Sequence, residues 1–213
     1  MRLTKHGHAC VRLENEKGVL IIDPGVITEA GVIDGADAVL ITHEHFDHLE
    51  ADRLRRAAAD DPRLEIWTCP AVAGQLADLG GRVHAVGHGD AVQVAGFDVR
   101  VYGERHAVIT PDLPVVQNVG FLVDGEVFHP GDAFTVPDVP VPTLCLPTNA
   151  PWMKVSEMVD YLREVAPQRA YSVHDGLLND AGLQLVDGQL TRQAQRLGAD
   201  VRRLALGESV SLP

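Results

Sequence analysis

Short runs of apolar residues, bounded by glycine, proline or aspartate, recur along the chain and predict β-strands. In the first part of the chain, residues 10–13 and 19–22 are expected to form a hairpin at the edge of a sheet. Later in the chain, further short apolar runs are bounded in the same way. The further strands are expected at residues 38–42, 65–68, 92–94, 97–102, 116–123, 126–128, 143–146, 170–173 and 201–206.

Segments whose apolar residues recur every three or four positions predict helices between these strands. Helices are expected at residues 49–59, from Pro70 to the Gly80-Gly81 pair, at 155–162 and at 190–197. Strands and helices alternate at both ends of the chain, with a block of strands in the middle. This order favours two packed β-sheets with helices outside, an α+β fold, over one doubly wound sheet. No repeat or linker-like run divides the chain, so we expect one domain over residues 1–213.

The composition is that of a folded protein and excludes several classes of partner. Of the 213 residues, 46% are hydrophobic, and 18 Lys and Arg stand against 30 Asp and Glu, which gives a net charge of −12. The negative charge argues against a nucleic-acid partner, which requires a surplus of basic residues. No apolar stretch approaches the ~20 residues that cross a bilayer, so we expect no membrane partner.

Two further features bear on the cellular compartment. The N-terminal residues lack the apolar run of a secretory signal, so we expect a cytoplasmic protein. Cys10, Cys69 and Cys145 lie far apart with no CxxC spacing. We therefore expect reduced, mostly buried thiols rather than disulfides or a thiolate zinc site.

The strongest chemical signal is the segment Thr42-His43-Glu44-His45-Phe46-Asp47-His48, which directly follows a predicted buried strand. In extended backbone, His43 and His45 point to the same side. With Asp47 and His48, four potential metal ligands gather at the carboxyl end of one strand, where α/β sheets place their ligands. Imidazole suits Zn, Fe or Mn, and a carboxylate lowers the charge of such a site.

Three more candidate ligands follow later strands. His106 comes after the strand at 97–102, Asp132 after the strand at 126–128, and His174 directly after the strand at 170–173. Each is weak evidence alone, because a turn aspartate or a strand-end histidine is common without a metal. Their order beside the HxHxDH segment makes them candidates for the same site.

These seven residues together resemble the signature of the metallo-β-lactamase-fold superfamily of metal-dependent hydrolases. The resemblance implies a four-layer αββα sandwich and a dinuclear site. His43, His45 and His106 would then hold one metal, Asp47, His48 and His174 the other, and Asp132 would bridge them. Asp23 matches a carboxylate of the family that orients a ligand histidine, which agrees with the usual need of metal-bound imidazoles for a second partner.

The N-terminal Gly7-His8-Ala9 and the compact length are most similar to the ascorbate-6-phosphate lactonase-like branch of that superfamily. This similarity implies that His8 contacts substrate or a ligand residue, whereas a hairpin histidine on an exposed face is the alternative. The stretch Pro147-Thr148-Asn149-Ala150-Pro151 departs from the glycine-rich segment of that branch. Trp152, Met153 and Phe46 could form an apolar wall of the site or belong to the core.

The resulting hypothesis is a hydrolase in which two divalent ions, Zn most readily and Mn or Fe as alternatives, activate water. The bond attacked would be of the ester type in a small molecule: a phosphodiester, lactone or thioester. Asp47 is the candidate for moving the proton of the water. An oxidoreductase on the same fold and an RNA-processing nuclease are the alternatives, and a homo-oligomer is expected on general grounds.

Overall fold

Two seven-stranded sheets form the centre of the molecule, and the computed structural model describes all residues, 1–213. In spatial order, the first sheet consists of β14 (Ser209–Ser211), β1 (Arg2–Lys5), β2 (Val11–Glu14), β3 (Val19–Ile22), β4 (Ala38–Ile41), β5 (Glu65–Thr68) and β6 (Val83–Ala85). The second consists of β13 (Asp200–Arg202), β12 (Arg169–Val173), β11 (Thr143–Pro147), β10 (Val127–His129), β9 (Gly120–Val123), β8 (Phe97–Tyr102) and β7 (Ala91–Val94).

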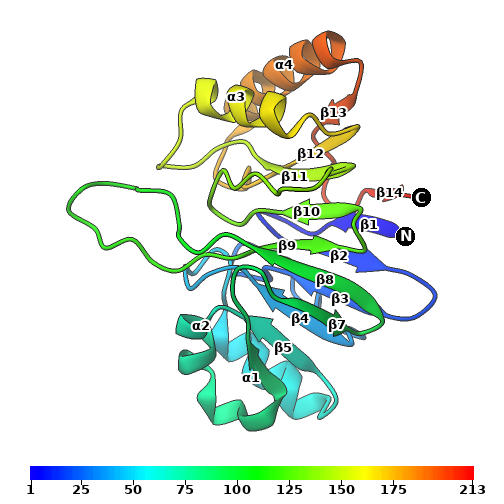
Figure 1. Cartoon of the computed structure of the whole chain (residues 1–213), viewed down its shortest axis with the longest axis vertical. Helices are drawn as coiled ribbons and strands as arrows, with labels where there is room; N and C mark the ends of the chain where they lie inside the picture. Colours follow the sequence, from blue (N-terminus) through cyan, green and yellow to red (C-terminus); the bar gives the residue numbers. More distant parts are fainter.

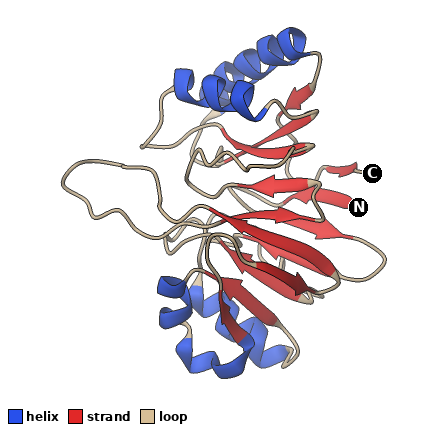
Figure 2. Cartoon of the chain, viewed as in Figure 1, coloured by secondary structure: helices blue, strands red, loops and turns tan.

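Helices lie on the outer sides of the two sheets, as the sequence predicts (Figures 1 and 2). The helices are α1 (Ala51–Asp60), α2 (Pro70–Gln75), α3 (Val155–Val165) and α4 (Asp180–Leu197), with a 3₁₀ helix at Ala77–Arg82. None of them is both long and apolar enough to cross a membrane. The result is the four-layer αββα sandwich expected from the sequence.

Successive side chains on the strands of the second sheet point to opposite faces and belong to two different hydrophobic cores. On β9, Phe121 and Val123 belong to the large core that includes residues of both sheets, whereas Leu122 belongs to a smaller core with α3 and α4. Opposite faces of one strand thus pack against different layers, as the two-residue period of a strand requires. The three cysteines are free and buried, as expected.

Several predicted boundaries were wrong. The hairpin of β2 and β3 is not at the edge of its sheet, because β1 and β14 pair beyond it. The strand expected at 116–123 begins only at Gly120, and the one expected at 201–206 ends at Arg202. The last helix begins at Asp180 instead of near Leu190, since the Asn179 side chain caps it by accepting a hydrogen bond from the Gly182 amide.

The directions of the strands determine which strand ends meet at the candidate functional site. Strands β3 and β4 run parallel to each other, as do β10, β11 and β12. The two neighbouring antiparallel pairings at β9 make β8 run in the same direction as β10. The carboxyl ends of β3 and β4 therefore meet at one edge of their sheet, and those of β8, β10 and β12 at one edge of the other.

Candidate metal centre

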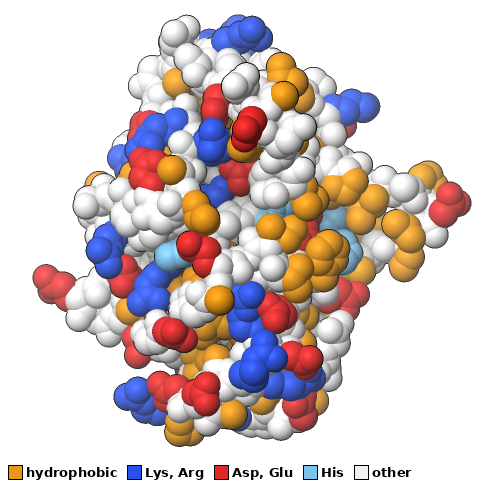
Figure 3. Space-filling model, turned by 180° about the vertical axis from the view of Figure 1, so that it is seen from behind, with side chains coloured by type: hydrophobic (Ala, Val, Ile, Leu, Met, Phe, Trp, Pro, Cys, Tyr) orange, Lys and Arg blue, Asp and Glu red, His pale blue; other side chains and the backbone are white.

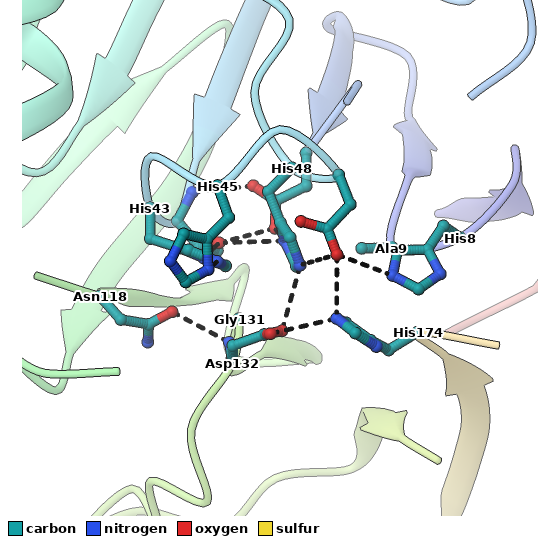
Figure 4. Close-up of polar contacts among 12 residues, drawn as sticks. His8, Ala9, His43, His45, His48, Asn118, Gly131, Asp132 and His174 are labelled. Carbon is teal, nitrogen blue, oxygen red and sulfur yellow. Dashed lines mark hydrogen bonds and ion pairs between the residues drawn. The ribbon is translucent and has the colours of Figure 1, made fainter. Parts of the chain in front are cut away.

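All seven predicted ligand side chains come together between the carboxyl ends of these strands. Figure 4 labels five of them: His43, His45, His48, Asp132 and His174. Two groups of potential ligand atoms form, each within 4.8 Å. One consists of His43, His45, His106 and Asp132, and the other of His8, Asp47, His48 and His174. The grouping differs from the expectation in two respects, because His8 joins the second group and Asp132 is grouped with the first alone.

The loop that carries four of these residues follows β4 and is held against the neighbouring loop by close backbone packing. A Cβ atom on Gly25 would lie 2.1 Å from the carbonyl group of Asp47, so only glycine fits there. The amide of Val26 donates to the carbonyl of Phe46 at 2.9 Å. These contacts fix the course of the loop between His45 and Asp47.

Asp23 lies at the centre of the hydrogen bonds behind the histidines. Its carboxylate accepts hydrogen bonds from the Thr42 amide at 2.8 Å and the Thr42 hydroxyl at 2.7 Å. The Nδ1 atom of His48 lies 2.6 Å from the same carboxylate, so Nδ1–H donates to it. His43 Nδ1 in turn lies 3.0 Å from the Thr42 hydroxyl oxygen and donates to it. Asp23 therefore lies behind His48 and, through Thr42, behind His43.

His106 and His174 are oriented by backbone carbonyls in the same way. His106 Nδ1 hydrogen-bonds the carbonyl of Ala107, and His174 Nδ1 that of Asn149. His174 has a positive φ of 61° directly after the end of β12. In both residues, as in His43 and His48, the hydrogen bond at Nδ1 leaves Nε2 as the ring atom that can bind a metal once it carries no proton.

The free atoms of this cluster are buried and have no hydrogen-bond partner. They are His48 Nε2, His106 Nε2, His174 Nε2 and Asp132 Oδ1. Four unsatisfied polar atoms in one buried cluster would be costly without a ligand. This donor set of imidazoles and carboxylates is one that Zn, Mn or Fe ions bind, so the residues fit a metal centre.

Asp132 lies between the two groups. One of its oxygens is 3.1 Å from His48 Nε2, and the other is 3.0 Å from His174 Nε2 and 3.3 Å from His106 Nε2. Two ligand atoms on one tetrahedral Zn ion are about 3.3 Å apart, so these separations are those of neighbouring ligands. The Trp152 indole N–H donates to Asp132 at 2.8 Å, and the Asp132 amide donates to the Asn118 side chain at 2.9 Å.

His8 is completely buried, which excludes the exposed position considered as an alternative. The Gly176 amide donates to His8 Nδ1 at 3.0 Å, so the proton of the neutral ring is on Nε2. That Nε2–H donates to Asp47 Oδ2 at 3.1 Å. Burial also lowers the pKa of His8, which keeps the ring neutral. Although it lies among the ligand atoms, His8 is thus a hydrogen-bond donor that holds Asp47.

Burial and mutual charge set the protonation of the cluster. Burial lowers the pKa of His43 well below its usual range, so this imidazole is neutral and ready to bind a cation. Burial alone would raise the pKa of Asp132, but the charge on His48 and the nearby His106 and His174 hold it well below its usual range. Asp132 is therefore a carboxylate at neutral pH.

Some groups around the site were not identified from the sequence. Thr42 and Asn118 give no signal beyond their type, and Trp152 is expected only as an apolar wall of the site or as part of the core. Lys5 is buried beside the segment that carries His174. Its ammonium group donates to the Asp175 carboxylate and to the Ser172 carbonyl, both at 2.7 Å. Such partners are as many as 170 residues apart along the chain, so nothing local in the sequence reveals them.

Known proteins show clear similarity to this chain. The sequence profile of the β-lactamase superfamily domain matches residues 2–174, which include all seven ligand candidates. Protein Rv0786c of Mycobacterium tuberculosis is 40% identical over 197 residues, which cover 90% of this chain and 92% of the relative. UPF0173 metal-dependent hydrolase MJ1163 of Methanocaldococcus jannaschii is 23% identical, with 99% of this chain and all of the relative covered.

A solved structure shares the fold. Igni18, a metallo hydrolase from the archaeon Ignicoccus hospitalis, has a TM-score of 0.72 at 19% identity, with 100% of this chain and 98% of Igni18 covered. The fold expected from the sequence is thereby confirmed. This chain belongs to the β-lactamase superfamily domain family, and its relatives include proteins named as metal-dependent hydrolases.

Proposed function

We propose that this protein is a hydrolase that uses two divalent cations, with Zn²⁺ the best suited, to cleave an ester-type bond in a small molecule. The observation that carries the proposal is the convergence of four buried, unpartnered ligand atoms, three imidazole nitrogens and an Asp132 oxygen. His43, His45 and His106 would hold one cation, and Asp47, His48 and His174 the other. Asp132 would lie between the two.

When bound, such a pair of cations lowers the pKa of a water molecule towards neutrality and thereby supplies a nucleophile. The side chains supply the remaining functions. Asp47 Oδ2 accepts a hydrogen bond from His8, which fixes the carboxylate beside His174. We assign to Asp47 the transfer of the proton of the attacking water to the leaving group. The Trp152 indole N–H donates to the Asp132 carboxylate, and the Asn118 side chain accepts from the Asp132 amide, so both hold Asp132 in place.

The proposed substrate is a phosphodiester, lactone or thioester. A lactone would agree with the similarity of Gly7-His8-Ala9 to the ascorbate-6-phosphate lactonase-like branch. The net charge of −12 supports a small-molecule partner over nucleic acid or an anionic membrane surface. A cytoplasmic location and a homo-oligomeric state remain part of this proposal.

The test begins with protein purified without added metal and then depleted by a chelator. Depleted protein and protein reloaded separately with Zn²⁺, Mn²⁺ or Fe²⁺ are assayed against a panel of phosphodiesters, lactones and thioesters. We expect hydrolysis that is lost on depletion and restored by one of the metals. Turnover that requires a reductant and oxygen would contradict the proposal and favour the oxidoreductase alternative.

A further inference from the structure

Exposed apolar side chains occur on each loop that carries the candidate ligands. Phe46 lies between His45 and Asp47 in the sequence and is 63% exposed. Val108 comes two residues after His106, and the 58% exposed Leu177 three residues after His174. Val26, three residues after Asp23, completes a set that we call the apolar rim: Val26, Phe46, Val108 and Leu177.

The rim is concentrated around the metal centre rather than scattered over the molecule. Figure 3 shows apolar side chains gathered around the histidine cluster and along the projecting loop beside it. The backbone hydrogen bond from Val26 to Phe46 places two members side by side. Leu177 follows Gly176, where a Cβ atom would lie 3.1 Å from the side chain of Ile27, the neighbour of Val26. These loops therefore meet at one place on the surface.

The exposure of the rim side chains does not contribute to the stability of the fold. Phe97, Phe121 and Phe128 are completely buried, which is the usual position of phenylalanine. Leaving a phenylalanine in water forgoes stabilisation that burial would supply. An exposed apolar patch beside polar catalytic groups is typical of a ligand-binding surface.

The projecting loop extends the apolar surface away from the site. It covers residues 107–115, and Figure 1 shows it standing out from the two sheets. Val108, Leu113 and Val115 are exposed there, and Asp112 is the sole charged residue of the segment. Pro111 and Pro114 restrict its backbone, which lowers the entropy lost when a ligand binds.

Two basic side chains near the ligand loops have other partners, and a third lines a hollow outside the ligand cluster. Arg53 pairs with Glu50 at 2.7 Å and donates to the carbonyls of Thr28 and Glu29. Lys5 is buried in its ion pair with Asp175. Arg105 lines a hollow with Cys69, Pro70 and Val115 of the projecting loop, and none of the ligand candidates or rim residues lines it. The rim therefore offers apolar contact but no cationic side chain for a phosphate group.

We propose, on the basis of the hydrolase function proposed above, that the apolar rim binds the hydrocarbon part of an uncharged carboxylic ester, thioester or lactone. Water adds to the carbonyl carbon, and the bond from that carbon to the leaving oxygen or sulfur breaks. The water oxygen stays in the carboxylate product. One proton goes to the leaving group and the other to solvent.

The test is a series of thioesters with acyl chains from acetyl to decanoyl, assayed with metal-loaded protein. We expect kcat/KM to rise about fourfold for each methylene that the rim covers. Phe46→Ser and, separately, Leu177→Ser are expected to lower the ratio of kcat/KM for the decanoyl substrate to kcat/KM for the acetyl substrate by at least about tenfold. The matched control is Leu185→Ser, since Leu185 is 74% exposed but lies on helix α4 rather than on a ligand loop.

A binding measurement separates this proposal from the hydrolase itself. Decan-2-one, an uncleavable ketone, is titrated into metal-depleted wild-type and Phe46→Ser protein and followed by ligand-detected NMR. Binding that Phe46→Ser weakens supports the rim even if no ester is cleaved, in which case the proposed function alone fails. Hydrolysis without chain-length dependence overturns the rim and leaves the hydrolase. A Phe46→Ser variant that changes only the oligomeric state in light scattering also overturns it, since the rim would then be an interface between copies.

Discussion

At the scale of single residues, the two carboxylates of the site are held by different partners, and this difference separates their roles. Asp47 accepts one hydrogen bond from His8 and is the more exposed of the two. Asp132 is held by the Trp152 indole and the Asn118 side chain, deep between the two groups of histidines. We therefore expect substitution of Asp47 to affect turnover first and substitution around Asp132 to affect metal affinity first.

Replacing Asp47 tests its assigned role in proton transfer. Asp47→Asn keeps the size of the side chain but removes the base, so we expect kcat of metal-saturated protein to fall roughly 10²–10⁴-fold, with a much smaller change in KM. The control is Glu44→Gln in the same loop, where Glu44 bonds only the side chain of Gln75. An unchanged kcat for Asp47→Asn would refute the role.

Replacing Trp152 tests the support of Asp132. Trp152→Phe keeps an aromatic ring but removes the indole N–H that donates to Asp132. Loss of such an outer partner weakens metal affinity about 10–100-fold, measured by competition with a chromophoric chelator. Trp67→Phe is the matched control, because the indole nitrogen of Trp67 has no hydrogen-bond partner. Equal affinities for the two variants would show that the bond to Asp132 has no such effect.

At the scale of strands and loops, the site depends on contacts that join the two sheets. Lys5 ends β1 of the first sheet, and Asp175 follows β12 of the second. Their side chains pair at 2.7 Å and are almost completely buried. The Ser172 hydroxyl also donates to the Asp175 carboxylate at 3.0 Å. These contacts fix the segment that carries His174.

We expect Lys5→Met to destabilise the protein by about 3–5 kcal/mol, because it leaves the Asp175 charge buried without its partner. Urea unfolding measures this change. Lys154→Met serves as the control, since Lys154 is exposed and lies 3.9 Å from Glu157, a kind of surface pair worth about 0–1 kcal/mol. A loss for Lys5→Met as small as that of the control would show that the pair is not structurally important.

The strands differ in how readily they could be predicted from the sequence. The apolar runs of β3, β4 and β8 are buried on both faces or alternate regularly, so their pattern identifies them. β1 and β14 were missed because Arg2–Lys5 and Ser209–Ser211 contain mostly polar residues. Their pairing depends on contact between the two ends of the chain, which no local pattern reveals.

The candidate ligands were predictable for a similar reason. Histidine and aspartate after predicted strands stand out by residue type and position, and their identification required no coordinates. The groups that orient them could not be identified in this way. Trp152, Asn118 and Lys5 have ordinary structural uses, and only the fold brings them to Asp132 and Asp175.

At the scale of the whole molecule, the candidate metal ligands come from both halves of the sandwich. The candidates on the loop after β4 come from the first sheet, whereas His106, Asp132 and His174 come from the second. Such a centre exists only in the folded state, so metal binding stabilises that state.

This arrangement predicts a particular pH dependence for the metal-free protein. Burial alone would lower the pKa of His174, but Asp132 and Asp47 raise it from 6.5 to about 9. The pKa of His174 is therefore higher in the folded state than in the unfolded state. Protonation of His174 stabilises the folded state fully below pH 6.5, and this stabilisation disappears as the pH rises through about 9. Urea unfolding across this range is expected to show the decline. A metal-free protein equally stable at both ends of the range would contradict the assignment.

The most direct test of the central claim is X-ray diffraction from crystals of protein purified without added metal, measured at the Zn, Mn and Fe absorption edges. We predict two anomalous peaks about 3.5–4 Å apart, both within the cluster of the seven side chains. One peak should lie among His43, His45 and His106, and the other among Asp47, His48 and His174, with Asp132 in contact with both. A single peak, or peaks outside this cluster, would contradict the account.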